Sequence, residues 1–193
     1  MSRRLAVAVL IACVTPLPAC LDQAPSLHAL IAEADAVAVP IEGTWVDKDD
    51  LGMTFEAAGR GYVLELRGKD CQDGDCVLRL DVRFGRIGDQ LFADFIGHDA
   101  DDEFGTWPVH AFARVTLDKD RLEFAVLHRD WVLAKVKAKP SSIAHEIADD
   151  KVVLTAKTAA LRKAMKEWMG DPKAFGNPLV FNRRAAVVPV AAQ

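Results

Sequence analysis

Strict alternation of apolar and polar residues is the feature that most constrains how this chain folds. In the segment "CVLRLDVRF", residues 76–84, every second residue from Leu78 to Phe84 is apolar and the residues between them are charged. Successive side chains of a β-strand point to opposite faces, so this spacing places one face against a core and the other in water. The pattern predicts a half-buried antiparallel strand over residues 76–84.

Shorter runs with the same period surround this segment, separated by Gly, Asp and Lys. They lie at residues 43–48, 52–58, 61–68 and 89–97, and along 107–127 with a turn at 118–120. A last run, "PLVFNRR" at residues 178–184, is placed to close the sheet. Regularly spaced short strands of this kind are typical of an antiparallel meander, which folds as a barrel or a sandwich.

Residues 156–169 change to a helical period. Apolar residues recur at i, i+3, i+4, i+7 and i+8 from Leu161 to Met169, and Gly170 and Pro172 follow directly. This spacing predicts an amphipathic helix that ends at the glycine. The sequence therefore predicts a mainly β (α+β) domain over residues 41–184, an antiparallel barrel or meander with a C-terminal helix at about 156–169, and a tail at 185–193.

The first 19 residues have the pattern of a secretory leader. Arg3 and Arg4 form a positive start, residues 5–14 are an apolar run, and the small residue Ala19 follows. Ten apolar residues are too few to span about 30 Å of hydrocarbon, which needs roughly 20 in a helix. We expect residues 1–19 to be a signal peptide, and its removal from the 193-residue chain leaves 174 residues.

The leader ends in "LPAC", residues 17–20, which resembles the lipobox of bacterial lipoproteins. The resemblance implies that Cys20 becomes the first mature residue and carries acyl chains, because two or more chains anchor stably in a bilayer. Leu21 after the cysteine resembles the pattern of proteins passed to the outer membrane, and it implies a lipid-anchored envelope protein that faces the periplasm. An ordinary leader with a chance cysteine is the alternative. Residues 20–40, rich in alanine, are expected to be the lipidated cysteine and a tether.

Cys71 and Cys76 remain once Cys13 is lost with the leader and Cys20 is lipidated. They flank an Asp-Gly turn between alternating runs, in a chain expected in an oxidising compartment. Facing residues at a hairpin end lie about 5.5 Å apart between Cα atoms, within disulfide range. A zinc site needs four ligands, and a thioredoxin-like redox pair has two residues between its cysteines. We predict a structural disulfide and no metal.

Replacing Cys71 and Cys76 together with serine should lower the free energy of unfolding by roughly 2 kcal/mol, the loop-closure value for so short a loop, and leave the fold intact. Urea unfolding followed by circular dichroism measures this change. A loss of stability on chelation of zinc from the unmutated protein would contradict the disulfide assignment.

"GTW", residues 43–45, resembles the G-x-W opening of lipocalins and other calycin barrels, in which the tryptophan packs under the barrel floor. The longer stretch 42–183 also looks like a group of uncharacterised bacterial proteins. They share the GTW start, a strand with "RxGxxLFxD", a strand with "PVHxxxRV" and a helix after "LTA". The resemblance implies a lipocalin-like barrel with added helices, and it implies no established activity.

Loss of Arg3 and Arg4 with the leader takes the 24 basic residues to 22 against 28 acidic ones, a net charge of about −6. This balance argues against nucleic acid as a partner. The sequence contains no G-x-S-x-G, no H-E-x-x-H and no phosphate-binding glycine loop, so we expect neither an enzyme nor a cofactor.

The candidate ligand-binding residues are Trp45 and three residues that share one face of a strand, His110, Phe112 and Arg114. His110 as a general base or ligand competes with the simpler reading of a histidine satisfied by a hydrogen bond. Two hypotheses remain: a non-catalytic module that binds an apolar small molecule or lipid, or a scaffold subunit, with a filled core, that docks on an envelope protein. In small barrels side chains usually fill the interior.

Overall fold

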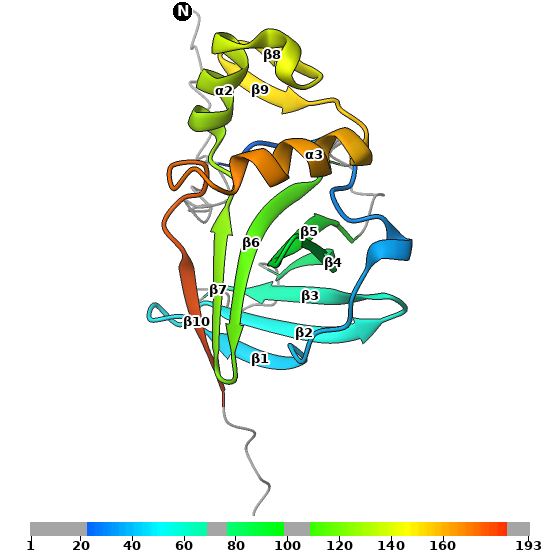
Figure 1. Cartoon of the computed structure of the whole chain (residues 1–193). Coiled ribbons are helices and arrows are strands. Elements are labelled where there is room, and N and C mark those ends of the chain that lie inside the picture. Colours follow the sequence, from blue (N-terminus) through cyan, green and yellow to red (C-terminus); the bar gives the residue numbers. More distant parts are fainter. Residues whose placement is uncertain (1–22, 69–76, 99–108, 185–193) are drawn as a thin grey trace, which may run out of the picture.

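A computed structural model of the chain describes residues 23–68, 77–98 and 109–184. Its main body is a closed antiparallel barrel whose strands neighbour one another in chain order (Figure 1). The barrel strands are β1 (Gly43–Val46), β2 (Gly52–Ala58), β3 (Gly61–Arg67), β4 (Val77–Ile87), β5 (Gln90–Gly97), β6 (Ala111–Asp118), β7 (Arg121–Val126) and β10 (Leu179–Arg183). The predicted mainly β fold is confirmed, and it is a lipocalin-like barrel with added helices.

Non-local pairing closes the ring. β10 pairs with β7 on one side and with β1 on the other, where Trp45 lies opposite Arg183. The local hairpins turn at residues with positive φ. Gly88 has φ +60° between β4 and β5, and Lys119 has φ 40° between β6 and β7. The predicted turn at residues 118–120 is confirmed. β4 runs three residues past the predicted end at Phe84, because its last residues pair with the start of β5.

The barrel has a core on each side of one wall. Trp45, Phe55, Phe84 and Phe181 belong to the core inside the ring. A second core lies outside β5, β6 and β7, because these strands carry apolar residues on both faces, as at the neighbours Phe112 and Ala113, both 0 % exposed. Strands covered on both faces lose the alternation of a half-exposed sheet. The wall formed by β5, β6 and β7 is therefore sandwiched between the two cores.

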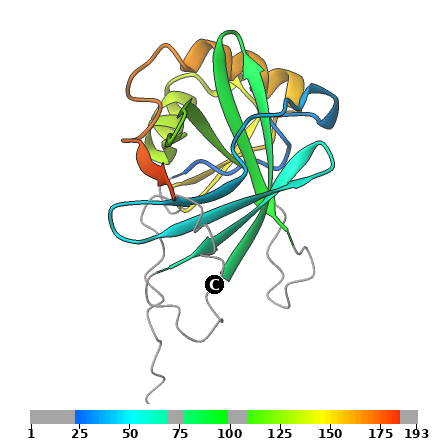
Figure 2. The same ribbon diagram turned by 90° about the horizontal axis from the view of Figure 1, so that it is seen from below.

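A long insertion between β7 and β10 covers the outer core. It contains α2 (Arg129–Ala138), the 3₁₀ turn η2 (Pro140–Ser142), the hairpin β8 (His145–Ala148) and β9 (Lys151–Leu154), and α3 (Thr158–Trp168). In Figure 1 α3 crosses the barrel, and Figure 2, seen from below, shows the helices gathered on one side of it. The predicted helix is confirmed, since Leu161, Met165 and Trp168 are buried against this core.

Residues 23–31, which we call the strap, dock on the same outer surface. Ala24 donates its N–H to the Leu127 carbonyl at 3.0 Å, and Ser26 exchanges two backbone hydrogen bonds with His110. Leu30 and Ile31 are 0 % exposed. A Cβ at position 85 would lie 2.7 Å from Ile31, so β4 has a glycine where the strap approaches it. The expected tether over residues 20–40 is therefore wrong for residues 23–40, which belong to the body and include the 3₁₀ turn η1 (Glu33–Asp35).

Candidate functional site

The two ends of the barrel differ. At one end, which we call the closed end, lie the start of β1 and the turns β2–β3, β4–β5 and β6–β7. Residues 37–42 cross this end, where the Val37 N–H donates to the Phe84 carbonyl at 2.8 Å and Tyr62 bonds to Val39. At the other end, which we call the loop end, lie the β1–β2 connection, the ends of β3, β5 and β7, the starts of β4, β6 and β10, and the insertion.

Trp45 is held at the closed end, as the G-x-W resemblance implied. Its ring is 0 % exposed, and its indole Nε1 donates to the Ile41 carbonyl at 2.7 Å. The Arg183 guanidinium stacks over the ring, 4.2 Å from its centroid, and donates to the carbonyls of Glu42 at 2.6 Å and Pro40 at 2.8 Å. The first strand, the last strand and the crossing segment are therefore joined at one point.

Aromatic rings fill the closed half of the interior. Tyr62 and Phe84 meet edge to face with centroids 5.5 Å apart, and Phe55 contacts Phe84 at 6.3 Å. Phe124 contacts Phe181 at 6.4 Å. All five side chains are at most 6 % exposed. Leu91, Val115 and Leu117 complete the lining of this half.

The loop half of the inner face is apolar and incompletely covered. The inward side chains there include Leu80, Phe95, Val126 and Leu179, and each of them is half-buried. Leu78, in the same inward row of β4, is 47 % exposed. Among the described residues of the inner face, Leu78 is the large apolar side chain that is exposed, which makes the loop end the candidate ligand site.

His110 points to the outer face and forms a buried pair with Asp94. Its Nδ1 lies 2.7 Å from Asp94 Oδ1, and the exposed fractions of the two side chains are 13 % and 3 %. The second carboxylate oxygen accepts the Ile31 N–H at 2.9 Å. The Ser26 hydroxyl donates to the His28 carbonyl at 2.9 Å, so it is not paired with the imidazole as a nucleophile would be. His110 is therefore a hydrogen-bonded histidine, which is the simpler of the two interpretations of the sequence.

The four candidate ligand-binding residues do not form one site. Trp45 lies inside the ring, whereas Phe112 is 0 % exposed in the outer core and the Arg114 guanidinium lies 5.0 Å from the Phe175 ring centroid. The inward residues of β6 are Ala113 and Val115. The face of β6 that His110, Phe112 and Arg114 share is the outer one, so these three residues do not line the barrel interior. A role for them in ligand binding stays a prediction.

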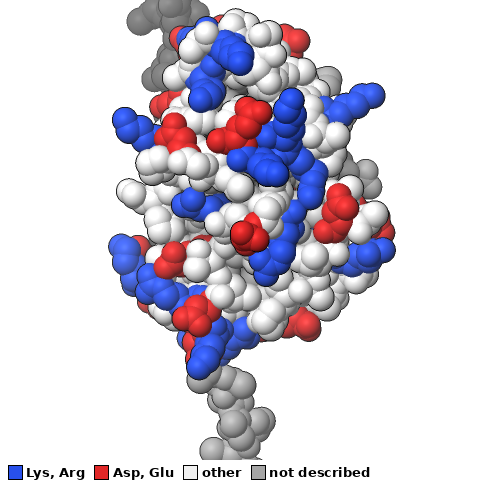
Figure 3. Space-filling model, viewed as in Figure 1, with Lys and Arg blue, Asp and Glu red and all other residues white. Residues whose placement is uncertain are grey.

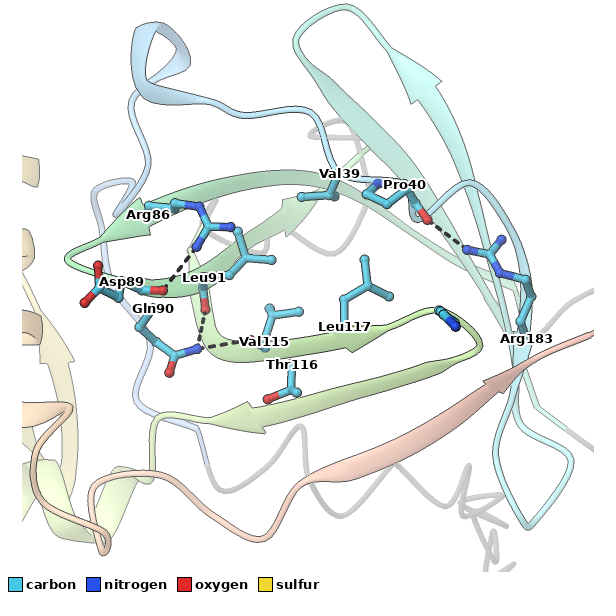
Figure 4. Close-up of a pocket in the computed structure, with 11 residues that line it drawn as sticks. Val39, Pro40, Arg86, Asp89, Gln90, Leu91, Val115, Thr116, Leu117 and Arg183 are labelled. Carbon is cyan, nitrogen blue, oxygen red and sulfur yellow. Dashed lines mark hydrogen bonds between the residues drawn. The ribbon is translucent and has the colours of Figure 1, made fainter.

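A groove at the closed end was not predicted from the sequence. It has a volume of about 600 Å³, and we call it the end groove (Figure 4). The residues that line it come from the crossing segment, two hairpins and the last strand: Val39, Pro40, Arg86, Asp89, Gln90, Leu91, Val115, Thr116, Leu117, Lys119 and Arg183. Arg86 and Lys119 lie in or beside hairpin turns, where charged residues are common. The sequence around them therefore gives no sign of a binding site.

Within residues 23–68, 77–98 and 109–184, no group of three or more His, Cys, Asp or Glu is arranged to hold a metal ion. No helix in the same part of the chain is long and apolar enough to cross a membrane. Comparison of the chain with protein-family models, curated proteins and solved structures finds no match. The predicted lipidation at Cys20 and the predicted disulfide between Cys71 and Cys76 lie outside the described residues.

Proposed function

We propose that the protein is an envelope protein anchored by lipid in the outer membrane and facing the periplasm. Its barrel binds an apolar small molecule or lipid at the loop end without catalysis. The observation that carries the binding proposal is the row of half-buried and exposed apolar side chains on the inner face of the loop half. The "LPAC" sequence after the charged and apolar start supports the anchor.

The physical argument is the contrast between the two halves of one interior. In the closed half, rings and the crossing segment cover most of the inner face, and the part that they leave open is the end groove. In the loop half, Leu80, Phe95 and Leu179 keep accessible apolar surface. A ligand that covers this surface gains about 25 cal/mol for each Å² removed from water. An apolar molecule of modest length is therefore the ligand class that this half would take.

The test uses the full-length chain with Cys20→Ser and the neutral apolar dye N-phenyl-1-naphthylamine. Dye fluorescence should rise to saturation, and Leu78→Asp should raise the Kd about tenfold, because an apolar ligand would desolvate the new carboxylate at a cost near 1.4 kcal/mol. Ile147→Asp is the matched control, since Ile147 is also an exposed apolar residue, 39 % exposed, but lies on β8 in the insertion.

Equal effects of the two substitutions, or a signal that does not saturate, would contradict binding at the loop end. Native mass spectrometry of the same protein gives a second readout, in which co-purified ligand supports the proposal. Recovery of the unmutated protein without ligand, but with an envelope protein in stoichiometric amount, would favour the scaffold alternative.

A further inference from the structure

We propose that the end groove is a second binding site, separate from the loop end, for an anionic amphiphile: a molecule with one singly charged acidic group, such as a carboxylate, and a short apolar chain. This site does not depend on the proposed function of the barrel interior. Its residues lie toward the closed end of the strands, where Val115 pairs with Phe124 of the aromatic group.

The floor of the groove is apolar. Leu91 and Val115 are 9 % and 2 % exposed, and Val39 and Leu117 are half-buried. Figure 4 shows these four side chains converging between Arg86 on one side and Arg183 on the other. A volume of about 600 Å³ is that of a small-molecule site, since such sites range from roughly 300 to 1,000 Å³ and combine an apolar lining with few polar groups.

Two cations at the rim lack a carboxylate partner among the described residues. Arg86 donates from Nη1 to the backbone carbonyl of Asp89 at 3.1 Å, which leaves its charge uncompensated, and Lys119 is exposed in the β6–β7 turn. Arg183 is already engaged by the carbonyls of Pro40 and Glu42. Its Nε also lies 3.6 Å from Asp120 Oδ1, so its charge is compensated. Arg86 and Lys119 are therefore the groups that can receive an anion.

Positive charge continues from the groove onto α3. Arg162 donates from Nη2 to the Arg86 carbonyl at 2.9 Å, which places the α3 cations beside the groove, and its Nη1 is buried without a hydrogen-bond partner. Lys163 and Lys166 are exposed on the same helix. In Figure 3 blue side chains gather in a run that crosses α3 and continues below it. Because Arg162 Nη1 lies 3.9 Å from Asp35 Oδ2, the charge on α3 that favours the approach of an anion comes from Lys163 and Lys166.

The lining also sets the number of charges on the ligand. Asp89 is the carboxylate among the lining residues, and it would repel a small multivalent anion. A ligand with one negative charge can bind Arg86 and Lys119 through that charge. Its apolar chain can then cover the floor formed by Leu91, Val115 and Leu117. Inorganic phosphate can contact only the cations, and a neutral alcohol can contact only the apolar floor.

The test follows backbone amide chemical shifts in the ¹⁵N-labelled full-length chain with Cys20→Ser, titrated separately with octanoate, 1-octanol and inorganic phosphate. Octanoate should shift the amides of Leu91, Val115 and Leu117 to saturation, at least tenfold more tightly than either other probe. The double variant Arg86→Gln/Lys119→Gln should weaken octanoate binding tenfold or more. The control Lys139→Gln/Lys151→Gln removes the same charge from the insertion and should leave binding unchanged.

Equal weakening by the two double variants would overturn the site, because it would show an effect of net charge alone. Octanoate shifts confined to loop-end residues such as Leu80 and Phe95 would also overturn it, and would favour the barrel interior instead. Phosphate binding as tight as octanoate binding would overturn the amphiphile as the ligand class. Saturating octanoate shifts at the groove, in a protein that fails to bind the neutral dye, would support this site and reject the loop-end proposal.

Discussion

Replacing Trp45 with alanine should lower the free energy of unfolding by about 3–5 kcal/mol, the range for removing a large buried aromatic side chain. The loss has three sources in the structure: the buried ring, its N–H bond to the Ile41 carbonyl at 2.7 Å, and the Arg183 guanidinium 4.2 Å above it. Equilibrium urea unfolding of the variant and the unmutated chain measures the change.

Trp131→Ala is the matched control for that substitution. Trp131 is half-buried in the insertion, meets Trp168 edge to face with ring centroids 5.5 Å apart, and donates its indole N–H to Asp171 at 3.2 Å. Its removal should cost less than half as much as removal of Trp45, because it joins no strands of the barrel. Equal costs for the two tryptophans would show that the closed end is not a principal source of stability.

Replacing Asp94 with alanine should lower the free energy of unfolding by about 2–4 kcal/mol. The carboxylate satisfies the Ile31 N–H and the His110 imidazole, and each buried partner left without a bond costs about 1–3 kcal/mol. Because Ile31 belongs to the strap, backbone amides of residues 24–31 should also exchange with solvent faster. Urea unfolding and amide hydrogen exchange measure the two effects.

The chain offers a close control in a second Asp–His pair. Asp81 Oδ1 lies 2.7 Å from His98 Nδ1, the same separation as in the Asp94 pair, but its side chains are 49 % and 34 % exposed. Exposed pairs contribute about 0–1 kcal/mol, so Asp81→Ala should change stability little. If the two aspartate substitutions cost the same, burial is not what gives the Asp94 pair its strength.

The sequence predicted the elements whose pattern is local. Alternation around β4 and the helical period of α3 come from neighbouring residues, so both were found. The strap was missed because it contributes single buried residues, Leu30 and Ile31, without a sustained period. The closure of β10 on β1 depends on residues more than a hundred positions apart, and short patterns carry no information on such pairs.

The candidate site was predicted only in part, for a related reason. Alternation correctly assigned His110, Phe112 and Arg114 to one face of β6, but both faces of this strand are covered. In such a strand small residues can face the interior, and here Ala113 does while Phe112 faces out. The end groove could not be predicted from the sequence, because its residues come from the crossing segment, two hairpins and the last strand, which only the closed ring brings together.

The docked strap limits where the protein can act if Cys20 carries lipid as proposed. Gln23 already pairs with His128, so three residue steps join the body to the anchor, and an extended chain covers at most about 3.5 Å per residue. The linker between the barrel and the acyl chains would be about 10 Å long, so the barrel would diffuse with the lipid in the plane of the membrane. It would meet molecules at the bilayer surface at high effective concentration, and it could not cross the periplasm to reach a distant partner.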